Sequence, residues 1–175
     1  MSEILKWMEA SLGPGVALLG VVVARAQWHT NDVKLRLDSY DRRLRVYKSA
    51  VGMLDAIRSE ILVRRGPAVH ATNLLPLKDY QDLPEEVVSS FLNCLMEAPF
   101  LFDRSIANFM QGIDKDRRSI ARLSRHLAGT FPLDTQGSRQ LDRQSLRESE
   151  ARIARAHEHI EAKFRRHLSL SRLQN

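Results

Sequence analysis

The 175-residue chain carries a formal net charge of +6 and a single cysteine, Cys94. One cysteine excludes a disulfide bond within the chain, which agrees with a reducing compartment such as the cytoplasm. The excess of basic residues favours an anionic neighbour. Because the basic residues alternate with acidic ones and no known nucleic-acid-binding motif accompanies them, the sequence argues against nucleic acid as a partner.

The first predicted element is a transmembrane helix between Trp7 and Trp28. No residue from Ala10 to Ala24 is charged, and tryptophan favours both interfaces of a bilayer. At about 1.5 Å per residue, a helix between the two tryptophans covers roughly 31 Å, which is close to the hydrocarbon thickness of roughly 30 Å. Arg25 lies near the end of this stretch and can extend its guanidinium to the interface.

Two other interpretations of this stretch are weighed against the span. A secretory signal peptide would be cleaved at Ala24-Arg25-Ala26, but acidic residues precede the apolar run and basic residues follow it, which opposes export. A buried helix of a soluble core fits poorly with so continuous an apolar run. Gly13-Pro14-Gly15 is the weak point of the span, because proline kinks a helix unless it lies in the first turn.

The charges that flank the predicted span set its orientation. The only positive charges before the span are those of Lys6 and the amino terminus. The sequence after the uncharged run is much more basic, with Arg25, Lys34, Arg36, Arg42, Arg43, Arg45 and Lys48. Positive charge stays on the cytoplasmic side, so we predict a single-pass protein of the bacterial inner membrane. Its amino terminus is outside, its carboxyl terminus is cytoplasmic and the lipid bilayer is its first partner.

The next predicted element continues the span as one long helix to about Arg65, where Gly66-Pro67 ends it. Apolar residues recur there at steps of four and three, at Val33, Leu37, Tyr40, Leu44, Tyr47, Val51 and Leu54. This heptad stripe fits either packing within a bundle or a parallel homodimer. Gly20 and Ala24 form a small-xxx-small pair, so the candidate self-association residues are Gly20, Ala24, Leu37, Tyr40, Leu44 and Tyr47.

The remaining elements are also predicted to be helical. A connection over 66–84 precedes a helix that begins near Pro84, is interrupted near Pro99 and continues to about Leu127. The last helix begins near Ser138. The predicted fold is therefore all-α, with an amino-terminal transmembrane helix continuous with an antiparallel bundle of about three long helices. The predicted domains are 1–28, the amino-terminal segment and span, and 29–175, the cytoplasmic bundle.

Two segments resemble a group of small uncharacterised bacterial single-pass membrane proteins. "KLRLDSYDRRLRVYKSA" (34–50) is similar to a K-L-x-L-D-x-Y-x-R-R-x-x-V-Y block that follows the span in that group. "MEAPFLFDRSIANFMQGI" (96–113) resembles their second block. The chain departs from the group at Ser39, where an apolar residue is usual. The resemblance covers the span, the first helix and the middle of the chain, and it implies an architecture but no activity.

The cluster Asp41, Arg42 and Arg43 is a candidate docking patch beside Tyr40. The alternative is an ordinary solvated face on which Asp41 and Arg45 form an i,i+4 ion pair, worth about 0.2–0.5 kcal/mol.

Two further clusters contain residue types that are common in active sites. Around Pro99 they are Glu97, Phe100, Phe102 and Asp103, and on the last helix they are His157, His159, Glu161 and His167. We expect an aromatic core in the first cluster and exposed histidines in the second, because the spacing lacks H-E-x-x-H and other metal-binding patterns. No catalytic, cofactor-binding or metal-binding residue is predicted, and Cys94 is expected to be a buried, inert thiol.

These features predict a membrane-tethered helical interaction or scaffold protein that is not an enzyme. Its partner is expected to be a second copy of the chain or another protein. The alternative is a membrane-perturbing effector, of the toxin or defence type, that oligomerises through its span.

Overall fold

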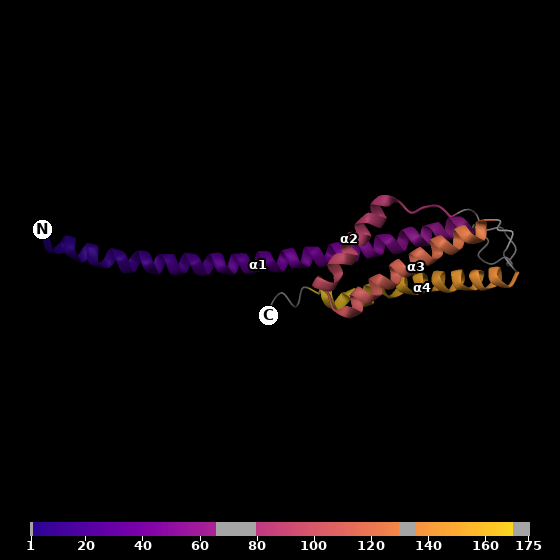
Figure 1. The fold of residues 1–175 in the computed structure, drawn as a ribbon. Coiled ribbons are helices and arrows are strands. Elements are labelled where there is room, and N and C mark those ends of the chain that lie inside the picture. Colours follow the sequence, from indigo (N-terminus) through magenta and orange to yellow (C-terminus); the bar gives the residue numbers. More distant parts are fainter. Residues whose placement is uncertain (1, 66–79, 130–135, 170–175) are drawn as a thin grey trace. The chain divides into compact units, whose positions relative to one another are not determined.

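The computed structural model describes the backbone of residues 2–65, 80–129 and 136–169, and their side chains from residue 20 onward except Gln136. Within these ranges there are four helices and no strand, so the prediction of an all-helical protein is confirmed. The helices are α1 (Ser2–Arg65), α2 (Glu85–Leu101), α3 (Arg104–Ala128) and α4 (Gln136–Leu168), which Figure 1 labels in chain order. Most of the connection predicted over 66–84 lies outside the described residues.

The chain divides into two compact units, residues 1–41 and 42–175. α1 belongs to both units, and it ends at Arg65 as the sequence predicts. Gly13-Pro14-Gly15 lies within the helical backbone of α1.

No helix in the described part of the chain combines the length and the apolar character that crossing a membrane requires. The span predicted between Trp7 and Trp28 is therefore not confirmed. The side chain of Trp7 lies outside the described residues, as do all side chains up to residue 19. Arg25 and Trp28, the other two residues predicted at the membrane interfaces, are both exposed.

The boundary between α2 and α3 follows from capping rather than from proline alone. Pro99 lies inside α2, and the helix continues to Leu101. The Asp103 carboxylate then accepts hydrogen bonds from the backbone N–H groups of Ser105 and Ile106, at 3.1 and 3.2 Å. These bonds satisfy two of the free donors at the start of a helix. The break predicted near Pro99 is therefore present, but it falls at Phe102 and Asp103.

Within residues 42–175, α4 runs antiparallel to both α1 and α3. Residues later in α1 or α3 contact residues earlier in α4. The contacting pairs are Tyr47–Phe164, Asp55–His157 and Arg64–Glu150 for α1, and Asp116–Arg152 and His126–Asp142 for α3. Figure 1 shows α3 and α4 side by side along most of their length.

All four helices contribute to one hydrophobic core in this unit. The fully or almost fully buried apolar residues are Val46, Ala50, Met53, Leu54, Ile57, Phe91, Cys94, Ala98, Ile106, Met110, Ile113, Ile120, Leu146, Ile153, Ile160 and Phe164. The prediction that Cys94 is buried is confirmed, and burial raises the pKa of its thiol.

The buried face of α1 differs in phase from the predicted heptad stripe. Its core positions are centred on Val46, Ala50, Met53 and Ile57, one residue away from Tyr47 and Val51, which are half-buried. Leu54, another member of the stripe, is completely buried. The stripe therefore coincides with the core face at Leu54 and lies at its edge at Tyr47 and Val51, because neighbouring residues on a helix are 100° apart.

Candidate functional site

The predicted self-association residues fall into an exposed group and a packed group. Gly20, Ala24 and Leu37 are exposed, and apart from its chain neighbours and the backbone of its own helix no described atom lies within 4 Å of a Cβ built on Gly20. Tyr40 and Leu44 are half-buried. Tyr47 packs its ring on Phe164, with 5.4 Å between ring centroids. Tyr47 therefore packs within its own chain, and self-association through the stripe stays a prediction.

Among the described residues, no hydrogen bond or ion pair joins the members of the predicted docking patch, Asp41, Arg42 and Arg43, to one another. Asp41 and Arg42 are exposed, whereas Arg43 is half-buried. The Nε atom of Arg43 is buried without a hydrogen-bond partner among the described residues. Asp41 and Arg45 do not form the predicted ion pair in the part of the chain that the structure describes.

The residues around Pro99 separate into different environments. Phe102 is buried and packs edge-on against Phe164, while Phe100 is 89% exposed. Glu97 is exposed, and Asp103 caps α3 and also pairs with Arg166. Desolvation raises the pKa of Asp103, but the hydrogen bond from the Ile106 backbone and the nearby Arg166 outweigh it and lower that pKa. Of the two aromatic residues beside Pro99, Phe102 therefore belongs to the expected aromatic core and Phe100 does not.

The histidines of α4 each have a different partner. His157 lies between Asp55 and Arg58 of α1, with ring nitrogens 2.9 Å from each of them. His159 lies 2.8 Å from the carbonyl oxygen of Arg155, and His167 packs edge-on against Phe102. Among the described residues, no three potential ligands are grouped as a metal ion needs.

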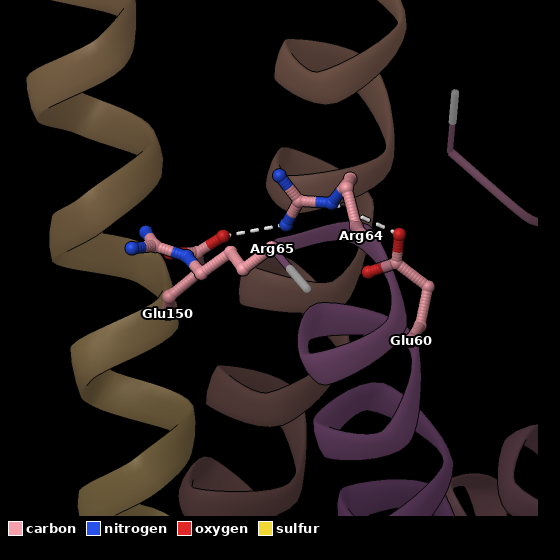
Figure 2. Close-up of polar contacts among 4 residues, drawn as sticks. All are labelled: Glu60, Arg64, Arg65 and Glu150. Carbon is pink, nitrogen blue, oxygen red and sulfur yellow. Dashed lines mark hydrogen bonds and ion pairs between the residues drawn. The ribbon is translucent and has the colours of Figure 1, made fainter. Parts of the chain in front are cut away.

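A buried charge cluster, which sequence reasoning missed, joins α1 to α4. Figure 2 shows Arg64 between two carboxylates, with its Nε 3.0 Å from Glu60 and its Nη2 2.5 Å from Glu150. Arg65 donates to the second oxygen of Glu150. The side chains of Arg64, Glu60 and Glu150 are 1%, 4% and 7% exposed. Such a group of charges is costly to bury, so every member depends on its partners.

Two polar atoms of this cluster are buried without a hydrogen-bond partner in the described part of the chain. They are Oε2 of Glu60 and Nη1 of Arg64. Desolvation by burial raises the pKa of Glu60, although the charge of Arg64 acts in the opposite direction. The cluster therefore lacks hydrogen bonds around Glu60. Of its members, Glu60 is the one whose ionised form is least stabilised.

An arginine-lined cavity of about 550 Å³ lies between the start of α2 and one face of α3. Four arginines of α3 line it: Arg117, Arg118, Arg122 and Arg125. The other side is formed by Tyr80 and Leu83, which precede α2, and by Val88. The guanidinium of Arg125 lies over the Tyr80 ring, 5.3 Å from its centroid. We call this the arginine pocket.

The arginine pocket contains two acidic side chains, Asp82 and Glu85. Arg125 pairs with Asp82. Arg117 and Arg118 both bind Asp114, each at 2.8 Å. Desolvation by burial raises the pKa of Tyr80, and the charge of Glu60 adds to that effect. Three of the four pocket arginines therefore have a carboxylate partner.

Both features have a pattern in the sequence. Glu60 and Arg64 extend the buried positions of α1 by steps of three and four from Ile57, so charged residues continue an apolar face. Arg118, Arg122 and Arg125 are spaced i, i+4 and i+7, which places them on one side of a helix. Neither pattern identifies the residues on the facing helix, such as Glu150, without the fold.

Comparison of the chain with models of protein families, with curated proteins and with solved structures finds no match. The resemblance to small bacterial membrane proteins therefore stays a prediction.

Proposed function

We propose that this protein is a membrane-tethered helical interaction module of the bacterial inner membrane. The observation that carries this proposal is the apolar surface near the start of the described side chains. Val21, Val22 and Val23 are 65%, 64% and 53% exposed, and Trp28 is 71% exposed. Exposed apolar surface of this size marks an interaction site with a membrane or another protein.

The arrangement of the three valines favours lipid as the neighbour. Consecutive residues on a helix are 100° apart, so Val21, Val22 and Val23 spread over about 200° of its circumference. A single partner helix covers a stripe of about 100°. Lipid surrounds a helix on all sides, and the sequence holds no charged residue from Ala10 to Ala24.

The basic residues after Trp28 give the proposed orientation, with the carboxyl terminus in the cytoplasm. We expect the cytoplasmic helices to bind a second copy of the chain. Val33 and Leu37 are exposed and Tyr40 and Leu44 are half-buried, at the spacing that a parallel coiled coil uses. Gly20 and Ala24 allow two spans to approach closely.

Topology and extraction together test the tether. A carboxyl-terminal alkaline phosphatase fusion should be inactive and a green fluorescent protein fusion should fluoresce, since phosphatase is active only outside the cytoplasm. The full chain should stay in membranes washed with alkaline carbonate. A Val22→Asp/Val23→Asp variant should be extracted, because each acidic residue at the centre of a span costs about 2.5–3.5 kcal/mol.

The matched control is Val33→Asp/Leu35→Asp, which makes the same chemical change outside the proposed span and should stay in the membrane. An active phosphatase fusion, or release of the unmodified protein by carbonate, would contradict the proposed membrane anchor and its orientation. Equal extraction of the two double variants would show that the valines have no special role.

A further inference from the structure

The arginine pocket has the charge and the size of a binding site for a small anionic molecule. Ligand sites commonly occupy about 300–1,000 Å³, and this cavity of about 550 Å³ lies within that range. Its lining contains four arginines but only two acidic residues, Asp82 and Glu85. Asp114, which binds two of the arginines, is the third carboxylate involved, so the guanidinium groups still outnumber the carboxylates.

One arginine of the pocket has no protein partner in the described residues. Arg117, Arg118 and Arg125 each pair with a carboxylate. Arg122 is exposed, and no hydrogen bond or ion pair joins it to the described part of the chain. Its five N–H donors are therefore available to a ligand, and the guanidinium fork fits phosphate oxygens well.

The arginine pocket also has a fixed frame and an apolar wall. Arg117 is held by its Nε and Nη2, at 3.1 and 2.8 Å from one oxygen of Asp114. Arg118 and Arg122 lie one helical turn apart, so both can reach one phosphate or two linked phosphates. Leu83 and Val88 border the same cavity and would contact an apolar part of the ligand.

We propose that the arginine pocket binds a phosphate-bearing molecule, with the phosphate on Arg118 and Arg122 and an apolar or aromatic part against Leu83 and Val88. A nucleotide and a phospholipid headgroup share this chemistry. This site lies wholly within residues 42–175 and does not depend on membrane insertion of α1.

The test is binding of trinitrophenyl-ATP, a fluorescent nucleotide, to the full-length protein. Saturable binding is expected. An Arg118→Gln/Arg122→Gln variant should bind about ten- to hundredfold more weakly, because each charge-assisted hydrogen bond that is lost reduces affinity severalfold or more. Arg122→Gln alone should also weaken binding, and because it breaks no ion pair within the described chain it should fold normally.

The matched control is Arg104→Gln/Arg143→Gln, which removes the same charge from exposed positions outside the pocket. Equal affinities of the two double variants would overturn the proposal, since any basic chain attracts anions weakly. Competition by ATP would identify a nucleotide, and competition by vesicles containing phosphatidylglycerol would identify a lipid headgroup. Failure of both to compete would also overturn it. These binding results do not depend on membrane anchoring, so either proposal can be overturned without the other.

Discussion

Residues 20–41 and residues 42–65 of α1 share one type of backbone but differ in what surrounds them. In the first stretch every side chain is exposed or half-exposed, including Val21, Trp28 and Leu37. In the second, Val46, Met53 and the other core positions are completely buried by α2, α3 and α4. The heptad spacing is similar in both stretches. Spacing therefore identifies a helix with an apolar face, but it does not identify the partner that covers this face.

The largest expected effect is at Phe164, the α4 residue that covers Tyr47 at the start of the buried stretch. Phe164→Ala should lower the free energy of unfolding by about 3–5 kcal/mol, because it removes a fully buried ring and leaves a cavity. The ring also packs on Phe102, with 5.2 Å between centroids. Urea denaturation followed by circular dichroism measures the change.

Phe100→Ala is the matched control for Phe164→Ala. It makes the same chemical change at a ring that is 89% exposed, and it should change stability by no more than about 0.5 kcal/mol. A similar loss of stability in both variants would show that the burial of α1 against α4 is not what stabilises this unit.

A somewhat smaller effect on stability is expected at the buried charge cluster, where the buried stretch of α1 ends. Glu150→Gln should destabilise the protein by about 3 kcal/mol, because Arg64 is left buried beside a neutral amide. Glu158→Gln, at an exposed position of the same helix, should change stability by no more than about 0.5 kcal/mol. If the two variants were equally stable, Arg64 would not depend on Glu150 for its charge.

The difference between the two stretches also explains which features of the fold could be predicted from the sequence and which could not. The end of α1 at Arg65 and the helical nature of the last element were predictable, because they depend on local signals such as Gly66-Pro67 and on periodicity. The predicted stripe on α1 matches the buried face at Leu54, but at Tyr47 and Val51 it lies one residue away from the buried positions. Periodicity cannot correct this, because Tyr47 and Val46 both suit a core position, and only the fold shows that Val46 is completely buried while Tyr47 is half-buried.

The buried charges show the same limit for the site. The pair Glu60 and Arg64 is visible in the sequence as an ordinary i,i+4 pair, which would be assigned to a solvated surface. Its burial depends on Glu150, which is 86 residues from Arg64 along the chain. The Asp103 cap is the opposite case, since it depends only on residues that follow within three positions and could have been predicted from Asp103 alone.

The effect of pH on the stability of this unit should be smaller than the effects of these substitutions, and it should depend on Glu60. Burial raises the pKa of Glu60 above its ordinary value of 4.5, so the folded state holds this proton more tightly than the unfolded state. Its contribution to stability is complete below pH 4.5 and is lost as the pH rises through the folded pKa. Relative to Glu60→Gln, the unmodified protein should therefore gain stability when the pH falls from 7.5 toward 4.5.

Urea denaturation at both pH values measures this change, with Glu97→Gln as the exposed control. The opposite trend, with the unmodified protein losing relative stability at pH 4.5, would show that the charge of Arg64 outweighs desolvation. The stabilisation by Glu60 would then belong to its ionised form.

The smallest effect on folding is expected at Leu37, in the exposed stretch. Leu37→Ala should change the free energy of unfolding by no more than about 0.5 kcal/mol, because no core surrounds this residue.

If the stripe instead joins two copies of the chain, Leu37→Cys in a Cys94→Ala background should form a disulfide between chains under mild oxidation. Facing positions of a parallel coiled coil bring two Cβ atoms within reach of that bond, whereas Leu35 lies about 200° around the helix. Leu35→Cys should therefore crosslink several times less. Equal crosslinking at both positions would mean that the exposed stretch has no preferred face and that Leu37 does not join two copies of the chain through the stripe.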